Sequence, residues 1–382
     1  MRIAVLRETL GGERRVALVP TTIATLKKAG FEFVVESGAG AGCFLSDSDY
    51  QNAGATVVVD RGELLRDADV VVKVQPPTVE EAGSLREGAV LVSTMQPLAN
   101  LEVVRVLMSK NVTTFSMDLV PRISRAQSMD ALSSQATASG YKAVLIAAAS
   151  LPKFFPMLTT AAGTIFAAKV LVLGAGVAGL QAIATARRLG AMVSAYDVRP
   201  AVKEQIESLG AKFLQFDPGE RDTEDKGGYA KALSAEAQQR QQKWLEDQIA
   251  GFDVVITTAL IPGKPAPRLI TRETVERMRP GSVIVDLAAE AGGNCEITQA
   301  GKTIEHNHVT VHGPVNLPST MAVHASQMYS RNVSGLITTL VKDGKVQIDL
   351  SDDVIRGALV THQGEVMHEA TRAAMAEAPN HK

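Results

Sequence analysis

Cysteine and net charge are both scarce in this sequence of 382 residues, and each scarcity argues against a class of protein. Cys43 and Cys295 are its two cysteines and lack CxxC spacing, so we expect neither a disulfide framework nor a metal site. The formal net charge of −2 argues against a basic surface for nucleic acid or anionic lipid. No apolar run approaches the ~20 residues that cross a bilayer, so no membrane span is predicted.

Hydrophobic residues are plentiful, at 46% of the chain, which is enough for large cores. The length predicts two or three domains. The first residues, Met1 to Arg7, have too short an apolar part for a signal peptide and are typical of a first β-strand. Together with the isolated cysteines, this predicts a cytoplasmic location.

Short apolar runs alternate with helix-like stretches along the chain, which is the pattern of doubly wound α/β domains. We therefore predict an α/β fold of two Rossmann-like, doubly wound parallel-sheet domains, joined by long helices and with a cleft between them. The expected strands are Ile3–Val5, Glu32–Val35, Val70–Val74, Leu91–Ser93, Thr113–Ser116, Val254–Ile256, Val283–Asp286 and Val309–His312.

Two stretches with few helix breakers, 130–149 and 325–340, are expected to form the joining helices. We predict a discontinuous first domain made of residues 1–130 plus 341–382. The second domain, 131–340, is expected to bind a dinucleotide because it contains the segment described next.

The most informative segment runs from Val170 through Gly174, Gly176 and Gly179 to Asp197. Its order of strand, glycine-rich turn, helix and second strand ending in an acid is the dinucleotide-binding fingerprint. Gly174 permits the tight turn, Gly176 lets the backbone approach the pyrophosphate, and Gly179 lets helix and strand pack closely. Glycines also mark ordinary turns, but here the strand, the helix and the acid all have the expected spacing.

The acid at the end of the second strand indicates which cofactor binds. The Asp197 carboxylate accepts from a ribose 2′-hydroxyl and repels a 2′-phosphate, so the sequence favours NAD(H) over NADP(H). Arg199, two residues later, weakens this preference slightly.

A connection longer than a Rossmann unit needs runs over residues 217–248 and is rich in Gln, Glu and Lys. The residues alone leave two readings open: a solvated surface excursion that ends in a helix, or a mobile lid over the nucleotide. Tyr229, which follows two glycines, is the candidate nucleotide contact in the second reading.

Residues 122–135, RISRAQSMDALSSQ, gather polar side chains just before the first joining helix. By composition alone, this segment is a helix start with Ser128 as its N-cap. Three further phrases accompany it: FPMLTTAAGT at 155–164, GAGVAGLQAIATA at 174–186 and TTALIPGKPAP at 257–267. With these four motifs, the sequence strongly resembles, from end to end, the NAD(H)-binding component of proton-translocating nicotinamide nucleotide transhydrogenase.

This resemblance implies roles for individual residues. Arg122, Asp130 and Ser133 are expected to orient the nicotinamide ring and carboxamide, while Gln127 reaches toward the partner's nucleotide. The family's mobile loop has a Gly-Tyr-Ala like that at 228–230, which favours the lid reading. The expected contacts to NAD(H) are Gly174, Gly176, Val177, Ala178, Gly179, Asp197, Val198, Arg199, Tyr229, Thr258, Ala259 and Leu260.

The resemblance also implies the reaction and the partners. The enzyme is expected to be a proton-translocating NAD(P)⁺ transhydrogenase, in which hydride passes directly from NADH on this chain to NADP⁺ on a partner subunit. Such a transfer needs no acid or base at the reacting carbons, only two rings held near contact. We expect a homodimer that forms the soluble first portion of a split alpha subunit. Its expected place is the cytoplasmic face of the inner membrane, beside NADP(H)-binding and proton-translocating membrane-spanning subunits.

Alanine dehydrogenase, a related family, is the rival reading, because Arg15, Lys73 and the sequence around Glu290 resemble its pattern. Oxidative deamination needs an acid–base group beside the substrate carbon. Where that family has a histidine this chain has Gln96, and its catalytic aspartate becomes Glu290. These losses favour transhydrogenation, with Arg15 and Lys73 paired to acids such as Glu8. A non-catalytic NAD-binding protein is a third possibility.

Overall fold

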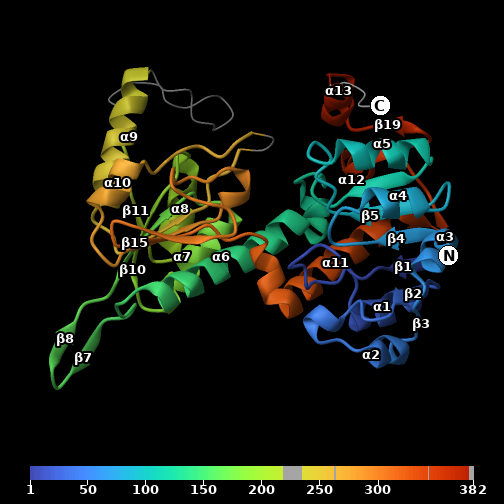
Figure 1. Cartoon of the computed structure of the whole chain (residues 1–382), viewed down its shortest axis with the longest axis horizontal. Coiled ribbons are helices and arrows are strands. Elements are labelled where there is room, and N and C mark those ends of the chain that lie inside the picture. Colours follow the sequence, from blue (N-terminus) through green and yellow to red (C-terminus); the bar gives the residue numbers. More distant parts are fainter. Residues whose placement is uncertain (218–234, 262–263, 343, 378–382) are drawn as a thin grey trace. The chain divides into compact units, whose positions relative to one another are not determined.

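The computed structural model describes residues 1–217, 235–261, 264–342 and 344–377. The chain divides into two compact units, and Figure 1 labels their helices and strands. The first unit comprises Met1–Gln135 and Pro318–Lys382, and the second comprises Ala136–Leu317. Each is built on one large, mostly parallel sheet, so the predicted α/β fold with two Rossmann-like sheets is confirmed.

The sheet of the first unit has the strand order β19-β18-β6-β5-β4-β1-β2-β3. Strands β1 to β6 are parallel, and β18 and β19 add an antiparallel edge. The chain starts at β1 in the middle and winds outward in both directions, which is the doubly wound topology. The bounds are β1 (Arg2–Val5), β2 (Glu32–Glu36), β3 (Thr56–Val58), β4 (Val70–Val72), β5 (Val90–Ser93), β6 (Thr113–Ser116), β18 (Leu359–His362) and β19 (Glu365–Val366).

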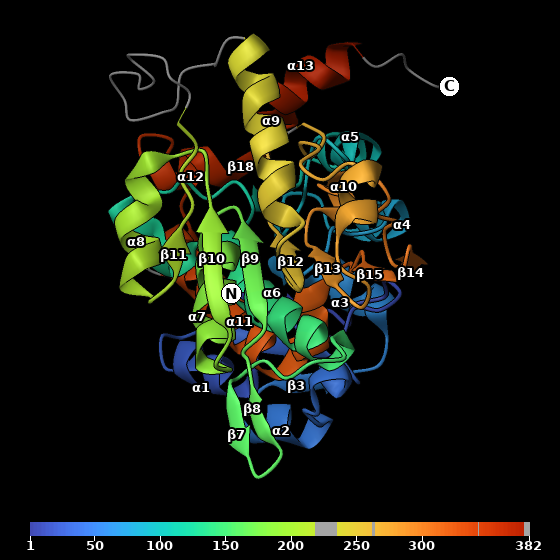
Figure 2. The same cartoon turned by 90° about the vertical axis from the view of Figure 1, so that its left-hand side faces the viewer.

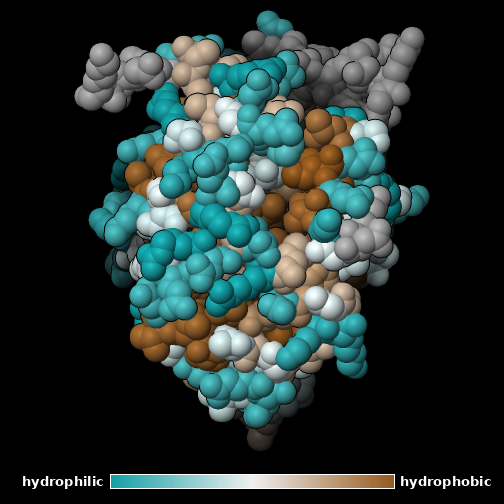
Figure 3. All heavy atoms as spheres, turned by 90° about the vertical axis from the view of Figure 1, so that its right-hand side faces the viewer, coloured by the Kyte–Doolittle hydropathy of each residue, from teal (hydrophilic) through white to brown (hydrophobic). Residues whose placement is uncertain are grey.

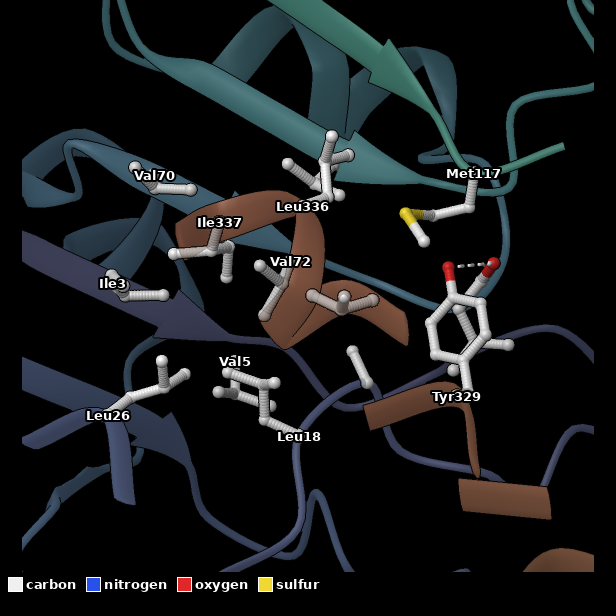
Figure 4. Packing of buried hydrophobic residues seen from close by; sticks show 14 of the residues in the cluster. Ile3, Val5, Leu18, Leu26, Val70, Val72, Met117, Tyr329, Leu336 and Ile337 are labelled. Carbon is white, nitrogen blue, oxygen red and sulfur yellow. Dashed lines mark hydrogen bonds between the residues drawn. The ribbon is translucent and has the colours of Figure 1, made fainter. Parts of the chain in front are cut away.

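Helices cover both faces of this sheet because alternate strand residues point to opposite sides. One face packs against α1 (Pro20–Lys27), α11 (Ala322–Leu340) and α12 (Asp353–Ala358), and the other against α3 (Arg61–Asp67), α4 (Val79–Ser84) and α5 (Leu101–Ser109). Two further α-helices of the unit are α2 (Asp47–Asn52) and α13 (Glu369–Glu377). Figure 4 shows the first of these cores, in which Leu18, from the connection before α1, packs with side chains from strands and helices: Ile3, Val5, Leu26, Val70, Val72, Leu336 and Ile337.

The sheet of the second unit has the order β11-β10-β9-β12-β13-β15-β14, which Figure 2 shows across the sheet. All its pairs are parallel except that of β14 with β15. The strands are β9 (Lys169–Leu173), β10 (Met192–Tyr196), β11 (Lys212–Phe213), β12 (Val254–Thr257), β13 (Val283–Asp286), β14 (Thr303–His306) and β15 (Val309–His312). A separate hairpin of β7 (Leu158–Thr160) and β8 (Gly163–Ile165) precedes them.

The second sheet is also covered on both faces. Helices α6 (Ala131–Ser150), α7 (Val177–Arg188) and α8 (Lys203–Ser208) pack on one side, and α9 (Ala235–Ile249) and α10 (Arg272–Arg277) on the other. Helix α9 begins within the predicted connection at 217–248 and ends one residue after it, so that connection ends in a helix. Tyr229 lies outside the described residues.

The units differ from the predicted domains mainly in the place of α11. The stretch at 325–340 is helical as predicted, but it belongs to the first unit rather than to the second domain. The reason is packing, because Tyr329, Val333 and Leu336 are buried in the core of the first sheet. Helix α6 crosses the boundary, which falls after Gln135.

The surface of the first unit is mixed in character. Figure 3 shows hydrophilic side chains over most of one face, with apolar side chains in separate clusters. Within the ranges that the structure describes, no helix combines the length and the apolar character needed to cross a membrane.

Candidate dinucleotide site

The glycine-rich turn connects β9 to α7 in the second unit, and two of its glycines are required by the geometry. Gly174 has φ +97°, and a Cβ added there would lie 2.6 Å from the Thr258 hydroxyl. A Cβ on Gly179 would lie 1.9 Å from the Gly174 carbonyl oxygen, which no side chain tolerates. A Cβ on Gly176 meets open space, and this residue is the N-cap of α7 without any side-chain cap. The helix N-terminus is therefore open to an anionic ligand.

Asp197 follows β10 and is bound on both carboxylate oxygens. The Ala175 N–H donates to Oδ2 at 2.7 Å, and Arg199 donates its N–H and Nε to Oδ1 and its Nη2 to Oδ2, each at 2.9 Å. Burial alone would raise the pKa of Asp197, but the bonds from Arg199 and Ala175 outweigh it and hold the pKa below its ordinary value. The group is thus a carboxylate tied to the glycine-rich turn.

The apolar side chains around this turn are exposed. Val177, Val198 and Leu260, all predicted contacts of the cofactor, have 42%, 58% and 56% of their surface exposed. Exposed apolar side chains beside an open helix N-terminus suit a ligand that has both phosphates and flat rings.

Thr258, Ala259 and Pro267, which follow β12, are held in place by hydrogen bonds. The Thr258 hydroxyl donates to the Gly174 carbonyl at 3.1 Å. Asn294, fully buried, accepts from Ala259 N–H at 3.0 Å and donates to the carbonyls of Ala259 and Pro267 at 2.9 and 2.8 Å. The sequence does not predict this role of Asn294, since a single asparagine after two glycines carries no distinctive spacing.

Asp286 holds the next connection, which follows β13. Its carboxylate is fully buried and accepts from Thr257 Oγ1 at 2.9 Å and from Thr298 Oγ1 at 2.7 Å. The Cys295 N–H adds a third bond at 3.0 Å. Asp286 and Asn294 therefore set the backbone from which Thr258, Ala259 and Leu260 project.

The polar segment at 122–135 belongs to the first unit and includes the helix η2 (Ser124–Met129). Arg122 and Gln127 are exposed. Asp130 accepts from the Ser133 N–H at 2.8 Å and from its hydroxyl at 2.6 Å, which is the bonding of an N-cap residue of α6. The cap is thus Asp130 and not Ser128, because η2 places Ser128 before the start of α6.

The buried cations of the first unit have partners. Lys73 Nζ lies 2.7 Å from Glu81 and 3.9 Å from Glu8, as the predicted pairing with acids requires. Arg15 binds Glu13 through two nitrogens and donates to Gln135 at 2.9 Å. These contacts occupy the cations that a carboxylate substrate would need.

Two of the acids in this network have shifted pKa values. Burial raises the pKa of Glu8 to about 7, although Lys73 and the Val74 N–H oppose the shift. Burial would also raise the pKa of Glu13, but hydrogen bonds and the charge of Arg15 lower it to about 2. Gln96, at the position of the missing histidine, has a left-handed backbone with φ 43°.

Comparisons with known proteins match both halves of the chain. Residues 4–139 match the family described as "Alanine dehydrogenase/PNT, N-terminal domain", and residues 143–369 match "Alanine dehydrogenase/PNT, C-terminal domain". A Rhodospirillum rubrum protein, the first of the parts that make up NAD(P) transhydrogenase subunit alpha, is 47% identical over 378 residues, covering 97% of this chain and 98% of that protein.

Solved structures give the same picture. A transhydrogenase structure from Sinorhizobium meliloti is 44% identical with a TM-score of 0.85, covering 97% of this chain and 100% of that one. An L-alanine dehydrogenase is 26% identical with a TM-score of 0.83, covering 99% of each. The backbone is thus shared with both kinds of enzyme, whereas the sequence is much more similar to transhydrogenases.

Proposed function

Because the chain belongs to the alanine dehydrogenase/PNT family through both of its domains, we propose that it is the NAD(H)-binding subunit of a proton-translocating NAD(P) transhydrogenase. The observation that carries the proposal is the 47% identity to the Rhodospirillum rubrum transhydrogenase chain over nearly the whole of both proteins. The paired state of Lys73 and Arg15 and the presence of Gln96 argue in the same direction, since a dehydrogenase of amino acids needs free cations and a proton shuttle.

NAD(H) binds to the second unit in this proposal. Its pyrophosphate lies at the open N-terminus of α7, where Gly176 leaves room for it. The adenosine ribose bonds to Asp197. Because four donors already occupy that carboxylate, the ribose hydroxyls replace bonds of the Arg199 guanidinium, while the Ala175 N–H keeps its own.

The reacting ring is oriented by the segment at 122–135. Arg122 donates to the carboxamide oxygen, and Asp130, held by Ser133, accepts from the carboxamide nitrogen. Gln127, an exposed side chain, reaches toward NADP⁺ on the partner subunit. Hydride then passes from ring to ring, which requires position rather than proton transfer from these residues.

The partners follow from the same assignment. An NADP(H)-binding subunit supplies the acceptor, and membrane-spanning subunits move the protons, so this chain is peripheral on the cytoplasmic face of the inner membrane. We further propose a homodimer. It is supported by the hairpin of β7 and β8, which projects from its unit in Figures 1 and 2. Exposed apolar side chains lie in and beside this hairpin: Ile165 in β8, and Phe154, Met157 and Phe166 in the flanking residues.

The test is NADH oxidation by the purified chain with two alternative acceptors. One assay contains the NADP⁺-loaded partner subunit, and the other contains pyruvate and ammonium. We expect turnover only with the partner. Turnover with pyruvate and ammonium would instead identify an alanine dehydrogenase, and nucleotide binding without turnover in either assay would identify a non-catalytic protein.

A further inference from the structure

Residues 121–134, which carry Gln127, form little secondary structure before α6 begins. Helix η2 is a short 3-10 helix without a side-chain cap at Ile123, and most of its residues are exposed. Two apolar residues, Ala126 and Met129, are buried, and they lie on one face because a 3-10 helix repeats every three residues. The position of Gln127 therefore depends on what packs beneath that face.

Helices α11 and α12, from the last portion of the chain, approach the segment closely, and each does so through a glycine. A Cβ added to Gly335 of α11 would lie 3.1 Å from Met129 Cγ. A Cβ added to Gly357 of α12 would lie 3.1 Å from Pro121 Cδ. Both distances are shorter than an ordinary van der Waals contact of a Cβ atom. The two glycines therefore allow residues 121–134 to lie closer to α11 and α12 than a side chain would permit.

Each helix also has one polar side chain that binds the segment. Asn332 of α11, which is 6% exposed, donates to the Ser128 carbonyl at 2.8 Å and accepts from the Ser134 hydroxyl at 2.7 Å. Asp352, the N-cap of α12, accepts two bonds from Arg125 at 2.6 and 2.8 Å. Asn332 thus binds on both sides of Asp130, and Arg125 lies two residues before Gln127.

We infer that Asn332 and Asp352 are positioning residues for hydride transfer, acting through the backbone of residues 121–134. This inference rests on the proposed function, because it gives the segment a ring-orienting role. Neither residue touches the nucleotide. Their loss displaces Gln127 and Asp130, and displacement near 1 Å lowers the rate of a reaction that depends on the approach of two rings by about 10- to 100-fold.

The experiment compares Asn332→Ala and Asp352→Asn with the full-length wild-type chain. Asparagine caps helices as well as aspartate does, so Asp352→Asn keeps the cap of α12 and loses only the ion pair with Arg125. The readouts are the hydride-transfer rate with the NADP⁺-loaded partner, the dissociation constant for NADH and the melting temperature. We expect the rate to fall far more than NADH affinity, at a temperature well below melting.

Two matched controls belong to the same unit. Asn100→Ala removes an amide that also donates to two carbonyls, those of Met95 and Gln96. Asp60→Asn changes another aspartate N-cap, that of α3. Both should keep the wild-type rate. In addition, the double variant Arg125→Ala/Asp352→Asn should transfer hydride no more slowly than the slower of the two single variants, because both substitutions remove the same ion pair.

The outcomes distinguish the two proposals. Wild-type rates in Asn332→Ala and Asp352→Asn would overturn the positioning role, as would equal losses in the two controls. A lower melting temperature with an unchanged rate would assign both residues to stability alone. An inactive wild-type chain would overturn the proposed function itself, and with it this inference.

Discussion

The two sheets have the same strand order around their central strands, but their first turns differ. In the second unit, β9 leads through Gly174 to α7 within four residues. In the first unit, β1 leads through the longer connection 6–19 to α1, and its two glycines, Gly11 and Gly12, are adjacent and lack the spacing of Gly174, Gly176 and Gly179. The neighbouring strands resemble each other, since β2 ends at Glu36 and β10 ends just before Asp197.

That acid makes the same backbone contact in both units. Glu36 accepts from the Arg7 N–H at 2.9 Å, as Asp197 accepts from the Ala175 N–H at 2.7 Å. In the first unit, Glu36 also accepts a hydrogen bond from the Arg61 guanidinium at 2.9 Å, and Arg61 forms a second ion pair with Glu81. Each sheet therefore has an acid bound to the connection after its first strand, and the closely spaced glycines of the second unit are the difference on which the proposed nucleotide site rests.

The largest expected effect is that of Gly179→Ala. Its Cβ would overlap the Gly174 carbonyl, so the turn must open, and we expect NADH binding to be lost and the melting temperature to fall. Gly83→Ala, in α4 of the first unit, places its Cβ in open space and should stabilise the protein by about 0.5–1 kcal/mol. NADH titration and thermal unfolding measure both, and normal NADH binding by Gly179→Ala would contradict the assignment.

The next largest difference is expected between the two acids, Asp197 and Glu36, in their effects on NADH affinity. Asp197→Ala removes hydrogen bonds to a charged acceptor and should weaken NADH binding about 10- to 100-fold, at roughly 1.5–3 kcal/mol. Glu36→Ala should leave the NADH dissociation constant unchanged and destabilise the first unit, because Arg61 loses a partner. Isothermal titration and chemical denaturation separate these effects. Equal affinities in the two variants would remove the distinction between the sheets.

A smaller effect is expected for the exposed glutamines of the first unit. Gln127→Asn shortens the side chain and should slow hydride transfer about tenfold, with NADH affinity retained. Gln96→Asn is the matched control, because asparagine tolerates the left-handed backbone of Gln96 and this residue has no proposed role. Single-turnover rates with the partner subunit give the comparison. Loss of NADH binding in Gln127→Asn would mean that its role is misassigned.

The last effect concerns pH and stability rather than the nucleotide, and belongs to the charge network of the first unit. The pKa of Glu8 is raised by burial from 4.5 to about 7, so the folded state binds its proton more tightly than the unfolded state. The resulting stability is complete below pH 4.5 and is lost as pH rises toward 7, at no more than about 1.4 kcal/mol per pH unit. Glu8→Gln should therefore show less loss of melting temperature across this range. If the melting temperatures of the wild type and of Glu8→Gln fall in parallel with rising pH, Glu8 does not titrate in this range.

The sequence predicts the strands well where their apolar runs are regular. The strands β1, β2, β4, β5, β6, β12, β13 and β15 all lie at the predicted places. Strands β18 and β19 are not among the predicted strands. The edge strand β19 has only two residues, and β18, which lies between β19 and β6, has two apolar residues, Leu359 and Val360. The glycine-rich turn could be predicted because Gly174 and Gly179 meet local steric needs and all three glycines have the spacing of the fingerprint.

The place of α11 could not be predicted, because an apolar helix face does not indicate which of two sheets it covers. The same limit applies to Asn294, Asn332 and Asp352. Each of these side chains binds atoms far away in the sequence, as Asn332 binds the Ser128 carbonyl, and a single sequence contains no signal of such a contact. Long-range polar contacts of this kind become visible only in the folded chain.

The central claim, direct hydride transfer from NADH on this chain, is tested most directly with NADH that carries deuterium at both C4 positions. The chain is mixed with its NADP⁺-loaded partner subunit in ordinary water, and the mass of the NADPH product is measured. We predict that each NADPH carries one deuterium, whichever face of the ring reacts. NADPH without deuterium, or no NADPH at all, would contradict the account.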